Sequence, residues 1–408
     1  HGEMSLQNTL IGMAQQFIGS NNINILEPNG QFGSRIMGGS DSASPRYIFT
    51  ELNRIVNSIF PELDFPLLNY LQDDGISVEP RYYIPIIPFV LVNGLLGIGT
   101  GFSSYIPKYN PKDIILNVKR KIQKKPYKPI HPWFQGFQGT IHKLNSKSYI
   151  TKGVYKILSP NKIEITELPI GTWTYNYKCF LDGLLYDKTK EQKSKFYIKD
   201  YIDRSDDTNV HFIITLLDKS LTEGIKCISD YIDSIEQAFK LTTTKYTNLT
   251  NIHLYNKDNV IQKYNSIFEI FDEHYEVRYE LYKTRKQYLL SKLELELKLH
   301  QSKLRFIQYV INDTIVVYKH SKSDIIDKLV EYEFLQYDGT QLLPSSTENG
   351  HLYNYLLHIQ IHQLTIDKVK ELKIKIDQIQ TEYDTIMNTS IEDMWIQELD
   401  SFSNIYNR

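Results

Sequence analysis

An arginine and a tyrosine are neighbours at Arg46 and Tyr47, within residues 41–50, which read DSASPRYIFT. A phenol with an ordinary pKa near ~10 is a weak nucleophile unless its anion is stabilised. A neighbouring guanidinium can stabilise that anion, and it can also bind an oxygen of a phosphate group. The pair therefore has the chemistry for covalent attack on a phosphodiester. The alternative is an accidental Arg-Tyr neighbour, since the chain has 30 tyrosines in 408 residues.

Basic residues are concentrated in the middle of the chain. Residues 1–115 contain 6 Lys and Arg against 10 Asp and Glu, residues 116–200 contain 17 against 6, and residues 201–408 contain 23 against 32. The three net charges are −4, +11 and −9, which sum to −2. Such a basic block is expected where one module lies along a polyanion. A solvated, lysine-rich surface is the alternative.

Composition also restricts the setting of the protein. The two cysteines, Cys179 and Cys227, are too few for a disulfide framework and fit a reducing, intracellular environment. No apolar run approaches the ~20 residues of a membrane span, and no signal peptide opens the sequence. Because the chain begins with His1 instead of methionine, we expect it to be a fragment of a longer protein.

The elements around the Arg-Tyr pair are expected to be helices and one hairpin. Helical spacing of apolar residues predicts a helix near the start and another that follows Tyr47 and stops at Pro61. The apolar sets are Met4, Leu10, Ile11, Ala14, Phe17 and Ile18, then Leu52, Ile55, Val56 and Ile59. A β-hairpin is predicted over residues 67–79, with its turn at 73–75. This order is typical of a winged-helix domain, although many α+β domains share it.

The pattern changes to short strands and loops over residues 116–262. The predicted strands and the one predicted helix cover residues 139–141, 148–150, 163–165 and 210–217, and then 221–239. The lysines near the start of this segment lie among Tyr127, Trp133 and Phe134; they are Lys119, Lys121, Lys124, Lys125 and Lys128. A mixture of basic and aromatic side chains is suited to contact with phosphates.

Two heptad patterns occupy the last third of the chain. One set steps by 4, 3, 4, 3, 4 and the other by 3, 4, 3, 4, 3; they are Leu293, Leu297, His300, Leu304, Ile307 and Ile311, and Val369, Leu372, Ile376, Ile379, Tyr383 and Ile386. Such spacing predicts two helices that pack along a seam. With the mixed sequence between them, they suggest an antiparallel coiled-coil arm with a small globular tip. Seams of this kind are more often structural than catalytic, so we expect the arm to position a dimer contact.

A series of short motifs extends over nearly the whole chain. They are His1-Gly2-Glu3, Gly19-Ser20-Asn21-Asn22, Gly30-Gln31-Phe32-Gly33, Gly38-Gly39, residues 41–50, residues 83–88, Asn93-Gly94, residues 97–101, Glu167-Leu168-Pro169, Thr172-Trp173-Thr174, Phe239-Lys240-Leu241 and residues 353–357. Together they resemble the breakage-reunion core of eukaryotic-type type IIA DNA topoisomerases. The first motif is similar to the tail of that family's Tyr-His-His-Gly-Glu sequence. The abundance of Ile, Asn, Lys and Tyr and the brief polar loop at 338–350 suggest a member from a large DNA virus or a parasite.

The resemblance implies a multidomain α+β fold in three parts. Residues 1–115 would form a winged-helix domain that carries the active-site tyrosine. Residues 116–262 would form a basic, mixed α/β tower domain that binds the arms of the DNA. Residues 263–408 would form an antiparallel coiled-coil arm with a small globular tip and a C-terminal dimerisation gate.

The resemblance also implies roles for the reactive residues. Tyr47 would attack a backbone phosphorus, form a 5′-phosphotyrosyl bond and release a 3′-hydroxyl. Because a phosphotyrosyl diester conserves the energy of the broken bond, resealing needs no external energy source. Arg46 would stabilise charge on the non-bridging oxygens. His1 would bind the phosphate or accept a proton, unless it is only a frayed terminal residue.

Further residues are expected to contact DNA. The family's counterpart of Ile98 is wedged between base pairs and bends the duplex; the alternative is an ordinary β-turn packed in a core. The glycine-rich run around it lacks the strand, helix and lysine of a nucleotide loop. Gln31 and Arg35 would approach the cleaved backbone. The candidates for holding the bent arms are Lys119, Arg120, Lys121, Lys124 and Lys125, although any one of them is more often a solvated charge.

Cofactors and partners follow from the same resemblance. Mg²⁺ and ATP are expected to serve the full-length enzyme and to be bound outside this fragment, in upstream metal-binding and ATPase domains, so no metal site is expected here. Alone, the fragment should bind double-stranded DNA and form a homodimer but cleave DNA poorly. No membrane is expected among its partners. Its location would be intracellular: the nucleus of a cellular eukaryote, or the host cytoplasm for a cytoplasmic DNA virus. The full enzyme would pass strands to relax or decatenate DNA.

Two rival classes of protein remain at this point. A non-catalytic, architectural DNA-bending protein would use Ile98 and the basic block but has no need of an Arg-Tyr pair on a rigid turn. A coiled-coil scaffold would account for residues 265–390 and for nothing before them.

Overall fold

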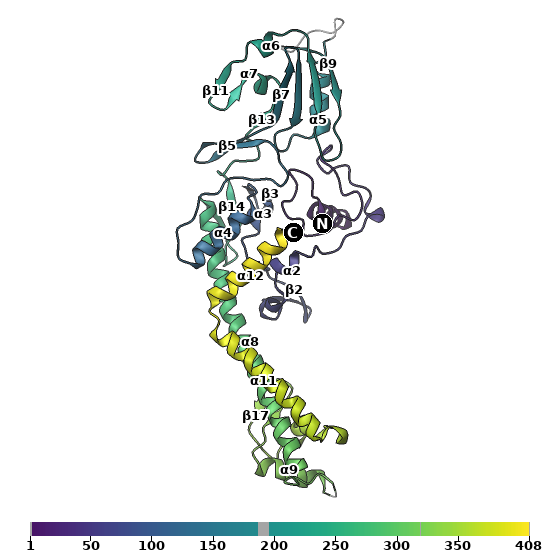
Figure 1. The fold of residues 1–408 in the computed structure, drawn as a ribbon, viewed down its shortest axis with the longest axis vertical. Coiled ribbons are helices and arrows are strands. Elements are labelled where there is room, and N and C mark those ends of the chain that lie inside the picture. The colour runs from purple at the N-terminus through teal and green to yellow at the C-terminus, as the bar shows by residue number, and fades with distance from the viewer. Residues whose placement is uncertain (1, 187–195, 319, 408) are drawn as a thin grey trace. The chain divides into compact units, whose positions relative to one another are not determined.

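The structure, a computed structural model, describes residues 2–186, 196–318 and 320–407. They form two units, shown in Figure 1: the first contains residues up to Arg278 together with those from Ile396 onward, and the second contains Tyr279–Trp395. Helices and strands are mixed in the first unit, which confirms the mixed α/β character expected from the sequence. No helix in the described part of the chain combines the length and apolarity needed to cross a membrane.

The first predicted helix is confirmed as α1, Glu3–Ala14, but it ends before Phe17 and Ile18. Asn21 explains the end, because its side-chain amide donates to the carbonyls of Gly12 (2.7 Å) and Gln15 (2.9 Å). The last carbonyls of a helix have no partner within it, so a side-chain donor at this point favours termination. Ile11 and Ala14 are buried, whereas much of the rest of the helix is exposed.

The helix predicted after Tyr47 is shorter than expected. Only Val56–Ile59 form it, as α2. The residues before it are extended, because Glu27 N donates to Glu51 O and Asn53 N donates to Ile25 O, both at 2.9 Å. A backbone paired with a distant segment cannot also make helical hydrogen bonds.

The predicted β-hairpin is confirmed. Strands β1, Tyr70–Asp73, and β2, Ile76–Pro80, pair in antiparallel fashion. The turn residues Asp74 and Gly75 both have positive φ, 46° and 79°. Two-residue turns of this kind match the twist of hairpin strands and favour Gly.

The remaining elements before residue 140 and after 245 in the first unit are helices and two further hairpins. They are η1 (Pro45–Tyr47), η2 (Glu62–Leu67), α3 (Val90–Asn93), β3 (Leu95–Gly99), β4 (Phe102–Ile106), α4 (Pro111–Ile122), β14 (Ile252–Tyr255) and β15 (Ile261–Tyr264). Helix α4 begins at Pro111 because the Asn110 side chain accepts from Lys112 N at 2.9 Å, an arrangement typical of helix starts. The first unit also includes the start of α8 (Ile267–Ile311) and the end of α12 (Ile391–Tyr406).

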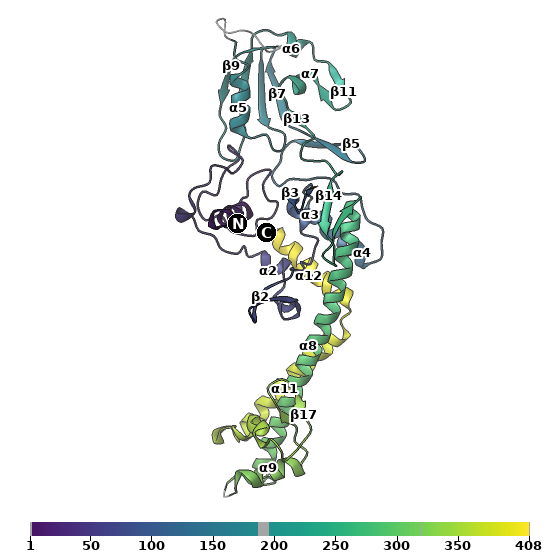
Figure 2. The same cartoon turned by 180° about the vertical axis from the view of Figure 1, so that it is seen from behind.

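Residues 140–243 contain two larger antiparallel sheets and one two-stranded sheet, β11-β12 (Cys227–Ser229 and Ile232–Asp233). One of the larger sheets has the order β7-β8-β10-β9 and the other the order β13-β6-β5. Their strands are β5 (Thr140–Asn145), β6 (Ser148–Lys152), β7 (Val154–Ser159), β8 (Lys162–Glu167), β9 (Ile198–Asp203), β10 (Phe212–Leu216) and β13 (Thr242–Thr243). Helix α5, Thr174–Asp182, lies against the four-stranded sheet in both views (Figures 1 and 2), and Tyr177 and Leu181 enter its core. The four predicted strands are confirmed.

The helix predicted over residues 221–239 is wrong. The segment instead forms α6 (Ser220–Glu223), β11 (Cys227–Ser229), β12 (Ile232–Asp233) and α7 (Ser234–Ala238). Gly224 follows the first short helix, and Gly destabilises a helix interior. Asp233 then caps a new helix: it accepts from Glu236 N at 2.8 Å, and its own N–H donates to the Glu236 carboxylate at 3.0 Å.

In the second unit, the two heptad patterns lie on α8 and on α11, Ile366–Asn388, which Figures 1 and 2 show side by side. Lys286 Nζ donates to the carbonyls of Met387 and Thr389, both at 2.8 Å, and Lys375 lies 3.6 Å from Glu296. Later residues of one helix therefore meet earlier residues of the other, so the two run antiparallel. Every predicted seam residue is buried or half-buried.

The segment between these helices has a core of its own. It is built from α9 (Lys322–Glu331), β16 (Gln336–Tyr337), β17 (Leu342–Leu343), η3 (Gly350–Tyr353), α10 (Asn354–Leu357) and η4 (Ile361–Gln363). Phe306 of α8 packs with Leu329, Phe334, Tyr353 and Leu356, all nearly inaccessible to solvent. The segment therefore has the small hydrophobic core that the predicted globular tip requires.

A half-buried histidine, His274, gives the first unit a testable pH dependence. Burial lowers the pKa of His274 from 6.5 to about 4, although its ring nitrogen contacts Pro85 O at 2.8 Å. The unfolded chain therefore binds this proton at a higher pH than the folded chain does. The contribution of neutral His274 to the free energy of unfolding is complete above pH ~6.5 and is lost as the pH falls towards 4. The free energy of unfolding changes by about 3 kcal/mol through this effect.

We expect His274→Gln, which retains a donor for Pro85 O, to flatten this acid-side loss. Denaturant unfolding of the chain at several pH values between 7 and 4 measures it. Equal pH slopes for the wild type and the variant would contradict the assignment.

Candidate nucleophile and nucleic-acid interface

The Arg46-Tyr47 pair lies on the surface, on the short helix η1. Tyr47 is 71% exposed, so its hydroxyl is accessible to a large ligand. The Arg46 guanidinium lies 6.0 Å from the centre of the Tyr47 ring, at the outer limit of a cation–π contact. The two side chains thus present a phenol and a positive charge together. That is the arrangement needed to bind an anionic ester beside a nucleophile.

Backbone hydrogen bonds hold the loop on both sides of the pair. Before it, Ala43 N donates to Gln31 O at 2.9 Å. After it, Phe49 and Asn29 exchange backbone hydrogen bonds of 3.0 and 3.2 Å, and Thr50 Oγ1 donates to Glu27 O at 2.9 Å. The turn therefore rests on residues 27–31, and the exposed side chains project from a backbone that is fixed at both ends.

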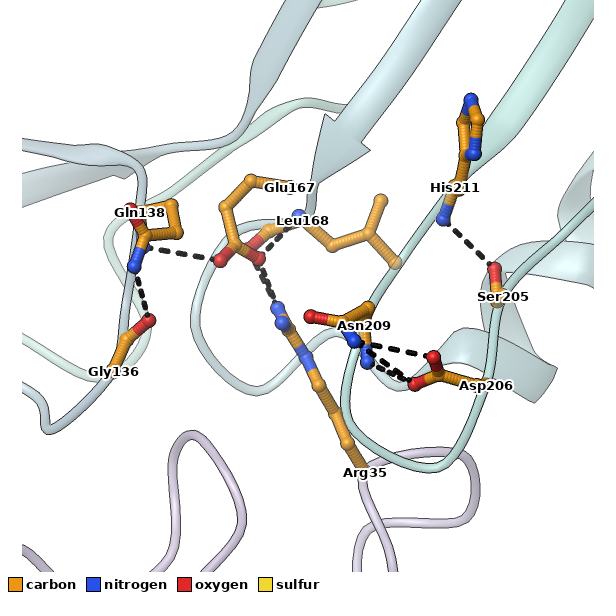
Figure 3. A network of polar contacts seen from close by, with 9 residues as sticks. All are labelled: Arg35, Gly136, Gln138, Glu167, Leu168, Ser205, Asp206, Asn209 and His211. Carbon is orange, nitrogen blue, oxygen red and sulfur yellow. Dashed lines mark hydrogen bonds and ion pairs between the residues drawn. The ribbon is translucent and has the colours of Figure 1, made fainter.

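The other residues predicted near the nucleophile differ in their surroundings. Gln31 is exposed, and its side-chain oxygen accepts from Gly33 N at 3.3 Å. Arg35 is 3% exposed, and its guanidinium forms an ion pair with Glu167 (Figure 3). The structure therefore brings Gln31 to the surface beside the loop and places the charge of Arg35 inside the protein. His1 lies outside the described residues.

Ile98 stands at the exposed tip region of the β3–β4 hairpin. It is 84% exposed, which rules out the alternative of a turn packed in a core. A Cβ added at Gly97 or Gly99 would meet no atom within 4 Å, and neither residue has a positive φ. Packing within the described chain therefore gives no reason for glycine at these two positions. A surface that must approach a partner closely does give one.

The hairpin is supported from behind by the second hairpin, β14–β15. Tyr105 N donates to Asn251 O at 2.8 Å, and Asn251 Nδ2 donates to Ser103 Oγ at 2.7 Å. Thr100 Oγ1 and Tyr255 Oη are 3.1 Å apart. These contacts hold the exposed Ile98 on a braced support, as a wedge would require.

The predicted basic residues lie at the end of α4 and just after it. Lys119 pairs with Asp400, and Lys121 Nζ lies 2.6 Å from Asp272. Arg120 Nε donates to Pro126 O at 2.6 Å, and Lys125 Nζ donates to Gln123 Oε1 at 2.9 Å. The structure brings the five predicted cations together, but two of them already have carboxylate partners within the first unit.

Those carboxylates were not foreseen, because Asp272 and Asp400 lie far along the sequence from α4. Tyr127 also belongs to this cluster: its hydroxyl donates to Asp272 at 2.6 Å. Burial, and then this hydrogen bond, raises the pKa of Tyr127 above its ordinary value. The hydroxyl therefore stays protonated near neutral pH and serves as the donor to Asp272.

Among the described residues, no group of three or more His, Cys, Asp or Glu side chains lies together as a metal ion would require. No residue of this part of the chain is therefore assigned to a Mg²⁺ site.

The fold and the site define a class: a multidomain, mixed α/β protein with an exposed Arg-Tyr pair and a braced apolar hairpin. Comparison with known proteins then gives the family. The family model of DNA gyrase/topoisomerase IV (A subunit) matches residues 1–400. The chain belongs to this family, which confirms the resemblance seen in the sequence.

Individual relatives agree with that assignment. The chain is 38% identical to the DNA topoisomerase 2 of Penicillium chrysogenum, over 99% of its own length and 26% of the relative's. It is 35% identical to that of Acanthamoeba polyphaga mimivirus, over 100% and 36%. A crystal structure of the DNA-binding, cleavage and re-ligation domain of Plasmodium falciparum topoisomerase II matches with a TM-score of 0.85 and 38% identity, over 100% of this chain and 56% of that one. The chain thus spans about a quarter to a third of these curated relatives.

Proposed function

We propose that this chain is the part of a type IIA DNA topoisomerase that cuts and reseals double-stranded DNA. The observation that carries the proposal is the exposed, braced Arg46-Tyr47 pair. It occurs in a chain with the fold of a topoisomerase II cleavage domain. The full-length protein would use this activity, with ATP and Mg²⁺, to relax or decatenate DNA inside the cell. The site would be the nucleus if the source is a cellular eukaryote, or the host cytoplasm if the source is a cytoplasmic DNA virus.

In the proposed reaction, the Tyr47 oxygen attacks a backbone phosphorus. The new phosphotyrosyl bond forms as the bond from phosphorus to the 3′-oxygen breaks. The phenolic proton leaves to an acceptor, for which His1 is the candidate, and the 3′-oxygen gains a proton to become a hydroxyl. Arg46 stabilises the charge that develops on the non-bridging oxygens. Resealing is the same set of steps in reverse, so bond energy is conserved.

The remaining assignments follow the three predicted parts. Residues 1–115 act as the winged-helix domain, 116–262 as the tower domain, and 263–408 as the coiled-coil arm with the dimer contact. Ile98 inserts between base pairs, which the exposure of its side chain permits. A homodimer supplies one Tyr47 to each strand. Upstream domains of the same polypeptide hold Mg²⁺ and ATP.

The basic residues are proposed to divide into two groups. Each phosphate contact that releases counterions contributes about 0.9 to the salt slope of DNA binding. Replacing both Lys124 and Lys125 by Gln should therefore lower the salt slope by the amount that two phosphate contacts contribute. Neutralising Lys119 and Lys121 should lower it less, because Asp400 and Asp272 already partner these lysines.

A salt titration of duplex binding by the two double variants measures the difference. Equal slopes for the two would contradict the division. An unchanged slope in both would remove the basic block from the DNA-binding surface.

The proposed function itself is tested by trapping. The full-length protein is incubated with duplex DNA and Mg²⁺, denatured and digested, and the peptide joined to the 5′-phosphate is identified. The expected peptide contains Tyr47. DNA binding and bending without any covalent adduct would support the architectural class of protein instead.

A further inference from the structure

A buried ion pair joins the nucleophile's domain to the end of β8, an inner strand of the four-stranded sheet. Arg35 and Glu167 are 3% and 1% exposed. Besides this pair, Arg35 Nη2 lies 3.4 Å from Leu168 O. The Glu167 carboxylate also accepts from Leu168 N at 2.7 Å and from Gln138 N at 3.1 Å (Figure 3). Both carboxylate oxygens are therefore used, and the pair is held in one geometry.

Other contacts attach the same short segment, residues 33–39, to the same domain. Arg35 N donates to Asp207 O at 3.3 Å, and Tyr175 N donates to Ile36 O at 3.0 Å. The ring of Trp173 lies so close to Gly38 that an added Cβ would come within 2.3 Å of it. Three separate parts of the sheet domain thus hold this segment: the end of β8, the start of α5 and the loop between β9 and β10.

The segment is also tied to the loop of Tyr47. Gly39 N donates to Ser34 O at 3.0 Å, and Ser34 N donates to the Asp41 carboxylate at 2.8 Å. Asp41 stands six residues before Tyr47 in the sequence. A displacement of Arg35 would therefore move the start of the turn that carries the nucleophile.

Stability alone does not account for this pair. Replacing both members of a buried ion pair by apolar residues is often neutral or stabilising, whereas removing one member is strongly destabilising. What the pair supplies beyond an apolar contact is one fixed geometry between two segments that are 132 positions apart in the sequence.

We propose that Arg35 and Glu167 are positioning residues that fix the Tyr47 loop relative to the sheet domain. Arg35 thereby acts on the reaction through the loop and makes no contact with the DNA backbone. This inference rests on the proposed function, and it replaces the direct phosphate contact expected for Arg35 from the sequence.

The test compares three full-length variants with the wild type: Arg35→Met, the double variant Arg35→Met/Glu167→Met, and Lys178→Met as a matched control. Lys178 belongs to an exposed ion pair with Asp203, 3.6 Å apart, in the same sheet domain. Each protein is measured for duplex affinity, for adduct formed at saturating DNA, for melting temperature, and for hydrogen exchange of the amides at Gly39 and Ala43.

We expect the double variant to keep the wild-type melting temperature and duplex affinity. Its adduct should fall by at least about tenfold, and its exchange at the two loop amides should rise. Lys178→Met should match the wild type. A double variant with wild-type adduct would show that the pair is only structural. A weaker duplex affinity for both variants that lack Arg35, with Lys178→Met unaffected, would restore the phosphate contact. Absence of adduct in the wild type would refute the proposed function and not this inference alone.

Discussion

Tyr47→Phe is expected to abolish the covalent protein–DNA adduct while leaving the fold and duplex binding intact. The substitution removes one oxygen atom, and this oxygen is the proposed nucleophile. Loss of a nucleophile typically lowers a rate by ~10⁴-fold or more. Because Tyr47 is 71% exposed, we expect the free energy of unfolding to change by no more than ~0.5 kcal/mol.

The measurement is denaturing electrophoresis of radiolabelled duplex after incubation with the full-length protein and Mg²⁺. Tyr82→Phe is the matched control, because this tyrosine is also exposed and lies in the same part of the chain. It should form the adduct at the wild-type level. An adduct that persists in Tyr47→Phe would assign the nucleophile to another residue and would refute the mechanism.

Arg46→Ala should separate binding from chemistry. If the guanidinium stabilises charge that appears only during phosphoryl transfer, its loss slows cleavage by ~10²–10³-fold and changes duplex affinity little. Arg46→Lys retains the charge but loses the planar fork of donors, so its rate should lie between those of the wild type and the alanine variant. Single-turnover cleavage at saturating DNA, with affinity measured separately, gives both quantities.

Arg54→Ala is the matched control for this experiment, since Arg54 is an exposed arginine eight positions further on. It should cleave at the wild-type rate. A loss of affinity in Arg46→Ala that equals its loss of cleavage would make Arg46 a docking contact for DNA, and transition-state stabilisation would have to come from elsewhere.

Local chemistry explains which elements could be predicted from the sequence. The hairpin at residues 70–80 and strand β10 depend on turn residues and on apolar runs that are visible in a short window. The motif containing Tyr47 is likewise continuous, so the residues proposed to react could be named from the sequence. The heptad spacing of α8 and α11 repeats over many residues, which makes it robust to single exceptions.

Long-range pairing explains the failures. The helix expected from Leu52 is extended up to Asn53 because of residues 25–27, which no local pattern reveals. Arg35 was expected to approach the cleaved backbone, and its partner Glu167, which follows 132 positions later, could not be foreseen. Lys119 and Lys121 likewise find their carboxylates in α12 and α8. In each case the sequence shows the charge or the helix propensity, and only the fold shows the distant residue that pairs with it.

The glycines of the β3–β4 hairpin that have open space around them matter for any attempt to raise the thermal stability of this protein. At positions with ordinary backbone angles and open space, replacing Gly by Ala commonly stabilises a folded chain by ~0.4–1 kcal/mol. Gly97 and Gly99 meet both conditions, so a search for stabilising substitutions in the free chain would select them early. The methyl groups so introduced would lie beside Ile98, on the surface proposed to press against DNA. A variant selected for thermal stability without DNA would thus carry added methyl groups on the surface that is proposed to approach DNA closely, and its gain in stability would come at the expense of that contact.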